Sequence, residues 1–174
     1  MLRFLLDGLL HHPLTEKPRT GKGGHQAGAA LRETPRANLG RSLAVRMLDA
    51  GSCNGCELEI QALGNPYYDL DRFGIHFVAS PRHANVLLVT GPVTRNMHDA
   101  LLRTYHAMPH PKWVVTVGDC TRGGGCFAGS YAVMDGVDDI LPVDLHIPGC
   151  APDPEALSAA LVTLLETATQ KESA

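Results

Sequence analysis

The chain has 174 residues, which is the size of one ordinary domain and is enough to bury a hydrophobic core. Its formal net charge of −3 is small, and its five cysteines are too few for the disulfide framework of a small secreted protein. The odd number and clustered spacing of the cysteines favour a metal site in a reducing compartment instead.

The first ten residues, MLRFLLDGLL, are an apolar stretch that Arg3 and Asp7 interrupt. The stretch is too short to span a bilayer, and no small-residue cleavage site follows it. We interpret it as a short amphipathic helix that lies on a partner or membrane surface, or alternatively on the chain's own domain.

Residues 11–41 are rich in Pro, Gly, Lys and Arg and show no sustained period, which predicts a mobile or extended arm. Residues 1–41 together carry seven Lys or Arg against three acidic residues, whereas the body of the chain is acidic. This asymmetry is typical of a segment that binds nucleic acid, anionic lipid or an acidic partner. Phe4 is its single aromatic residue, so little in it would stack on bases, and we expect no nucleic-acid partner.

From residue 42 onward, short β-branched runs alternate with longer helical patterns. The predicted strands are 43–49, 75–80, 84–91, 112–120 and 143–150, and the predicted helices are 56–64, 94–108 and 153–170. Near-continuous apolar strands separated by amphipathic helices indicate a parallel sheet that is covered on both faces. We therefore predict an open, mostly parallel, flavodoxin-like α/β domain over residues 42–174, after an N-terminal segment of residues 1–41.

The last helix has the clearest boundary signals. Asp153 is the predicted N-cap, and Pro154 takes the first helical position, where its missing N–H costs nothing. The apolar stripe that should face the sheet consists of Ala156, Leu157, Ala160, Leu161 and Leu164.

Four cysteines follow predicted strands. Cys53 and Cys56 come after the first strand, Cys120 ends the fourth and Cys150 ends the fifth. Carboxyl ends of parallel strands meet at one edge of a sheet, where ligands of open α/β folds bind. We therefore expect these thiols to converge on zinc or an iron–sulfur cluster, which explains them better than four unrelated buried cysteines. Cys126 follows a glycine run, and we expect it near the site without being a ligand; the alternative is that it replaces Cys120.

The spacing of the cysteines favours the cluster. Structural zinc sites usually take two local C-x2-C pairs, whereas this chain has one pair and two single cysteines. Glycines beside the cysteines would let the backbone approach an inorganic core and aim N–H groups at its sulfurs: Gly55, Gly118, Gly123, Gly124, Gly125 and Gly149. The segment GDCTRGGGCFAGS matches neither the P-loop nor the dinucleotide-binding pattern, so nucleotide binding is the weaker interpretation.

Three motifs, GSCNGCELEI, GDCTRGGGCFAGSYAV and IPGCAPDPEAL, resemble those of the small electron-transfer subunit shared by [NiFe] hydrogenases and respiratory complex I. The resemblance covers about residues 42–166, with the motifs in the family's order. The complex I subunit has two adjacent cysteines in the first motif, whereas hydrogenase small subunits have C-x2-C, as Cys53 and Cys56 do here. The short chain is similar to the membrane-bound, energy-converting hydrogenases and formate hydrogenlyases.

The resemblance implies one [4Fe-4S] cluster, ligated by Cys53, Cys56, Cys120 and Cys150, close to the active-site metal of a separate [NiFe]-type large subunit. The chain would relay single electrons between that site and a ferredoxin-like iron–sulfur subunit, and it would hold no catalytic residue of its own. The complex would include membrane subunits. The resemblance and the missing twin-arginine signal place the chain peripherally on the cytoplasmic side of the cell membrane.

Two more side chains bear on this resemblance. Glu59 falls where the family places a carboxylate after the second cysteine, so it either faces the large subunit in proton transfer or is an exposed helix carboxylate. His146 either tunes the cluster by hydrogen bonding or is a satisfied core histidine. Cys126 and the basic arm depart from the family pattern.

Two other functions stay open from the sequence. A complex I-like quinone reductase subunit would share the fold and the cluster, but its large subunit would lack the cysteine pairs that hold nickel and iron. A zinc-stabilised binding module with no enzymatic role would be colourless.

Overall fold

The computed structural model describes residues 42–134 and 136–172, with side chains as far as Glu166. The predicted amphipathic helix and basic arm, residues 1–41, lie outside the described residues. The proposed division of the chain after residue 41 therefore stays a prediction.

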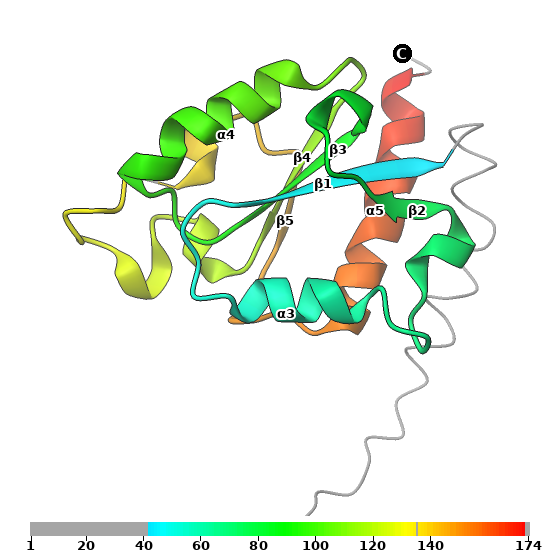
Figure 1. Cartoon of the computed structure of the whole chain (residues 1–174), viewed down its shortest axis with the longest axis horizontal. Coiled ribbons are helices and arrows are strands. Elements are labelled where there is room, and N and C mark those ends of the chain that lie inside the picture. The colour runs from blue at the N-terminus through cyan, green and yellow to red at the C-terminus, as the bar shows by residue number, and fades with distance from the viewer. Residues whose placement is uncertain (1–41, 135, 173–174) are drawn as a thin grey trace, which may run out of the picture.

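Five strands form one parallel sheet at the centre of the molecule, in the order β2-β1-β3-β4-β5 (Figure 1). This order is that of the flavodoxin-like doubly wound fold, which confirms the predicted fold class. The strands are β1 (Leu43–Asp49), β2 (Ile75–Phe77), β3 (Val86–Thr90), β4 (Trp113–Val117) and β5 (Leu145–Ile147). Each pairs in parallel with its neighbours, for example through Val45↔Val86 and Thr90↔Val117.

The two central strands, β3 and β4, have almost entirely apolar sequences. Every residue of β3 and β4 is buried, because helices cover both faces there. The edge strands β2 and β5 are shorter than the predicted runs 75–80 and 143–150. A 3₁₀ helix (Pro81–His83) soon follows β2, and Pro148, which has no backbone N–H to give to a ladder, follows β5.

Three α-helices cover the sheet: α3 (Gly55–Ala62), α4 (Arg95–Ala107) and α5 (Pro154–Glu172). Figure 1 shows α3 and α5 on one face and α4 on the other. The core on the α3/α5 face joins Ile60 and Leu161 to Val115, and the core on the α4 face joins Leu101 to Val114. Alternate residues of β4 thus serve opposite cores. Short 3₁₀ helices occupy Leu70–Phe73, Asp119–Thr121, Gly125–Phe127 and Val137–Asp139.

Helix α5 begins as its sequence predicts, because the Asp153 carboxylate accepts a hydrogen bond of 2.7 Å from the backbone N–H of Ala156. Leu157, Leu161 and Leu164 are buried. The predicted stripe was wrong at Ala156, which is exposed. It lies five residues before Leu161, which at 3.6 residues per turn places it roughly 140° around the helix from the centre of the buried face.

Candidate metal centre at the carboxyl edge of the sheet

The turn after β1 fixes the first two cysteines. The Asp49 carboxylate accepts hydrogen bonds of 2.7 Å from the backbone N–H groups of both Gly51 and Ser52, which bends the chain away from the strand. Asn54 then takes a left-handed conformation (φ 71°) immediately before α3. Cys53 is therefore exposed on the turn, and Cys56 lies half-buried in the first turn of the helix.

The other two predicted ligands lie on turns that are bonded to each other. The backbone N–H of Asp119 donates to the carbonyl of Gly149 (2.9 Å), and the Asp119 carboxylate accepts from the N–H of Gly149 (2.8 Å). This two-way pair joins the turn that follows β4 to the turn that follows β5. Cys120 and Cys150 are the next residues along each turn, so their separation is set by this contact.

The four predicted ligands influence one another electrostatically. The pKa of the Cys56 thiol is raised to about 12, chiefly by burial and then by the charges of Glu57, Cys120, Cys53 and Cys150 in that order. Burial likewise raises the pKa of Cys120, with Cys150 contributing a smaller part. The other three predicted ligands thus all affect the pKa of Cys56, and their joint role as ligands stays a prediction.

Glycines leave room around these sulfurs. A Cβ atom on Gly118, at the end of β4, would lie 2.7 Å from Cys56 Sγ and 3.3 Å from the carbonyl oxygen of Gly149. Gly118 also has a φ of 88°, which L-residues rarely adopt. Backbone with no side chain thus passes directly beside a predicted ligand, which is the kind of cradle that a bulky inorganic group needs.

The predicted donors, all within residues 42–134 and 136–172, do not form a single-ion site in the structure. Among the described residues, no three His, Cys, Asp or Glu side chains come close enough together to hold one metal ion. A zinc ion needs its thiolates about 2.3 Å from one point. A [4Fe-4S] cluster binds each thiolate at a different iron corner and so spreads the four sulfurs apart. In their chemistry, four cysteine thiolates are a donor set of the kind that a [4Fe-4S] cluster takes.

Cys126 follows Gly125, whose backbone packs against Cys120; the sequence predicted Cys126 near the site. It belongs to the 3₁₀ helix Gly125–Phe127, is exposed, and is one of the groups that affect the pKa of the Cys120 thiol. None of the described charge effects on Cys56 comes from Cys126. That Cys126 is a neighbour of a ligand and not itself a ligand stays a prediction.

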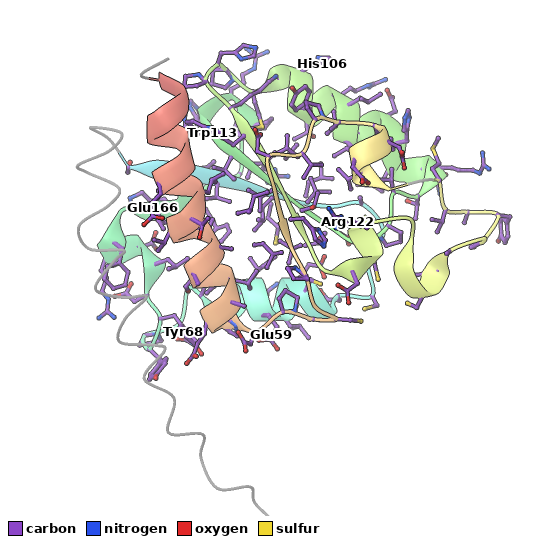
Figure 2. The ribbon with its side chains drawn as sticks, turned by 180° about the vertical axis from the view of Figure 1, so that it is seen from behind. Glu59, Tyr68, His106, Trp113, Arg122 and Glu166 are labelled. Carbon is purple, nitrogen blue, oxygen red and sulfur yellow. The ribbon has the colours of Figure 1, made fainter. Side chains whose placement is uncertain are left out.

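A carboxylate that sequence reasoning did not single out lies closer to the thiols than Glu59. Glu57 is 3 % exposed, and neither carboxylate oxygen has a hydrogen-bond partner among the described residues. Glu59 is half-buried, lies near Tyr68 in Figure 2, and is one of several acidic groups that raise the pKa of Tyr68 after burial. The sequence CELE contains both Glu57 and Glu59. Which of the two side chains is buried depends on where α3 begins, and it begins at Gly55.

His146 is held by hydroxyl groups and makes no described hydrogen bond to a thiol. Its Nδ1 lies 2.9 Å from Thr116 Oγ1 and 3.4 Å from Thr121 Oγ1, and the Thr121 hydroxyl donates to the carbonyl of Gly118. Burial lowers the pKa of His146, and the neighbouring guanidinium of Arg122, on the loop after β4 in Figure 2, lowers it further. The satisfied-histidine interpretation fits these contacts.

None of the helices within 42–134 and 136–172 combines the length and the apolar character that crossing a membrane requires.

Comparison with known proteins agrees with the motifs. Residues 53–164 match the family model described as the 20 kDa subunit of NADH ubiquinone oxidoreductase. The chain is 43 % identical over 143 residues to formate hydrogenlyase subunit 7 of Escherichia coli strain K12, covering 82 % of this chain but only 56 % of that protein. It is 46 % identical over 128 residues to the probable membrane-bound hydrogenase subunit mbhJ of Pyrococcus furiosus, covering 74 % of this chain and 77 % of that one.

Solved structures extend the likeness. A chain of the membrane-bound sulfane sulfur reductase, an archaeal respiratory membrane complex, superimposes with a TM-score of 0.67 at 32 % identity, over 86 % of this chain and 78 % of that one. A chain of an NAD⁺-reducing [NiFe]-hydrogenase superimposes with a TM-score of 0.58 over 73 % of this chain and 93 % of that one; at 18 % identity this shows the fold alone. As its cysteine motifs predicted, the chain belongs to the family of the 20 kDa subunit of NADH:ubiquinone oxidoreductase and the related hydrogenase subunits, a family of oxidoreductase complexes.

Proposed function

We propose that this chain is an electron-transfer subunit that holds one [4Fe-4S] cluster through Cys53, Cys56, Cys120 and Cys150. The observation that carries the proposal is the position of these cysteines after three strands of one parallel sheet, with the backbone of Gly118 so close to Cys56 Sγ that no Cβ would fit. When bound, the cluster would supply one-electron redox chemistry. The chain's residues act as thiolate ligands and as the frame that fixes them.

The state of the thiols couples cluster binding to proton release. Because burial and, after it, neighbouring charges raise the pKa of Cys56 to about 12, this thiol is protonated at neutral pH until a metal displaces the proton. Asp119 and Gly149 hold the Cys120 and Cys150 turns together whether or not these thiols are protonated. The contact that joins these two turns therefore does not use the thiol protons that a metal would displace.

We propose that the partners are a [NiFe]-type large subunit, a ferredoxin-like iron–sulfur subunit and membrane subunits, with the chain on the cytoplasmic side of the membrane. The names of the relatives support this proposal, since they include subunits of formate hydrogenlyase and of a membrane-bound hydrogenase, and a respiratory membrane complex. Glu59 is then a proton-transfer residue toward the large subunit, and residues 1–41 contact a partner or the membrane surface.

A complex I-like role is the second candidate, because the matching family model carries the name of an NADH:ubiquinone oxidoreductase subunit. The two candidates differ in the large subunit that co-purifies with the chain. Nickel in that subunit would support the hydrogenase-type complex, and a nickel-free subunit that supports quinone reduction would support the other.

The test is anaerobic purification of the full chain followed by metal and sulfide analysis. We expect a brown protein with about four iron and four sulfide per chain and an electron paramagnetic resonance signal on reduction. Serine in place of Cys53, Cys56, Cys120 or Cys150 should remove the cluster or change its spectrum, whereas Cys126→Ser should leave the iron content nearly unchanged. Stoichiometric zinc without iron would overturn the proposal in favour of the binding module.

A further inference from the structure

One thiol is left outside the proposed ligand set, and it lies beside a ligand. Cys126 directly follows Gly125, whose backbone packs against Cys120, and the Cys126 thiol is one of the groups that affect the pKa of Cys120. The five cysteines are all free in the structure. Cys120 and Cys126 are therefore two reduced thiols that the loop holds near each other, six positions apart in the chain.

The glycine loop between the two cysteines brings them near each other. Gly123, Gly124 and Gly125 have φ values of 60°, 84° and 52°, so three consecutive left-handed residues fold the chain back on itself. A Cβ atom on Gly125 would lie 2.8 Å from Cys120 Cα and 3.1 Å from Cys120 Sγ. The residue just before Cys126 thus packs against Cys120 with no space for a side chain.

The two thiols differ in their access to reagents. Cys126 is exposed, whereas Cys120 is half-buried at the end of β4. Thiol–disulfide exchange with a soluble reagent begins at an accessible sulfur, and a neighbouring thiol then resolves the mixed disulfide. This arrangement supplies one residue for each step.

We propose that, in the cluster-free chain, Cys120 and Cys126 form a reversible disulfide by exchange with a small-molecule disulfide such as oxidised glutathione. Cys126 attacks the reagent, forms a mixed disulfide and releases one glutathione. Cys120 then attacks the Cys126 sulfur and releases the second glutathione, so that two protein thiols are oxidised and one glutathione disulfide is reduced to two thiols. A reducing dithiol reverses both steps.

The consequence rests on the proposed function, because Cys120 is one of the four proposed ligands. A disulfide at Cys120 removes one corner of the ligand set and leaves the other three in place. The cluster-free chain would then accept a cluster only in its reduced state, and the bond would also shield Cys120 from further oxidation.

The experiment uses the full chain prepared without iron, incubated anaerobically with oxidised glutathione. Thiols are then blocked, and the chain is cut with trypsin and a protease that cleaves before aspartate. The sequence places Cys120 in fragment 119–122, Cys126 in 123–134, Cys150 in 144–152, and Cys53 with Cys56 in 49–68. Mass spectrometry of linked fragments therefore identifies the partner of Cys120, and iron and sulfide uptake are measured before and after dithiothreitol.

We expect 119–122 linked to 123–134 as the main cross-linked product, with iron uptake lost and then restored on reduction. Linkage of 119–122 to 144–152 or 49–68, or no linkage at all, would overturn the inference. Undiminished iron uptake by the linked chain would overturn the gating role. Failure of the fully reduced chain to take up iron would instead count against the proposed function. Cys150→Ser, which keeps the pair, should still cross-link, and Cys126→Ser should not.

Discussion

Gly118 offers a direct test of the site geometry, because alanine there has two separate costs. Its φ of 88° and ψ of 154° lie in a region that is essentially restricted to glycine, where other residues cost about 1–3 kcal/mol. In addition, the new Cβ would lie 2.7 Å from Cys56 Sγ, so the thiol must move. We expect Gly118→Ala to destabilise the chain by roughly 2–4 kcal/mol and to displace a proposed ligand.

Gly123→Ala is the matched control, because Gly123 also has a positive φ (60°) but has no other group within 4 Å of the place that a Cβ would take. It should cost only the left-handed backbone term, about 1–2 kcal/mol, and should leave the thiols in place. Thermal unfolding of the purified full chain measures stability, and iron per chain after reconstitution measures the site. Equal losses of stability and equal iron contents in the two variants would refute the steric argument.

Three further predictions concern groups around the thiols. Asp119→Ala removes the acceptor for the Gly149 N–H and should lower the free energy of unfolding by about 1–2 kcal/mol, whereas Asp119→Asn keeps an acceptor and should cost less, as thermal unfolding would show. Glu57→Gln should raise the reduction potential of the reconstituted cluster more than Glu59→Gln does, because Glu57 is the charged group that affects Cys56 most strongly. Equal shifts of the two variants in redox titrations would contradict this. The pKa of His146 in the folded chain lies below 6.5, so the neutral imidazole contributes stability above pH 6.5, and this contribution is lost as the pH falls through the folded-state pKa. His146→Asn should therefore make the free energy of unfolding, measured with urea, less dependent on pH in this range.

The sheet was predictable from the sequence because burial on both faces leaves a plain signature. The runs VLLVT and WVVTV have no polar face, and each is a buried central strand. The edge strands were predicted too long. Apolar residues continue past the last ladder pair of β2, Val45↔Phe77, and the run predicted for β5 extends through Pro148 beyond its last pair, Val117↔Ile147. An apolar run in the sequence indicates which residues are buried, whereas the ends of a strand are set by its hydrogen-bonded pairing with the neighbouring strand.

The positions of the four thiols were also predictable, because a parallel topology places the carboxyl ends of strands together. The choice between Glu57 and Glu59 was not, since it depends on the phase of a helix whose start is fixed by the left-handed Asn54. The position of Cys126 near Cys120 follows from the backbone angles of three glycines, which can adopt many conformations and therefore leave no pattern in the sequence.

The two-way contact between Asp119 and Gly149 also sets the order of events during biosynthesis. Gly149 is positioned by β5, which follows every other strand of the sheet in the chain. Until β5 has left the ribosome and paired with β4, Cys150 has no fixed position relative to Cys120. Cys53 and Cys56, which follow β1, are then present without a complete set of ligands. A metallocentre of this kind can be completed only on a nearly finished polypeptide, so a delivery factor that met the nascent chain early would find two thiols and no site.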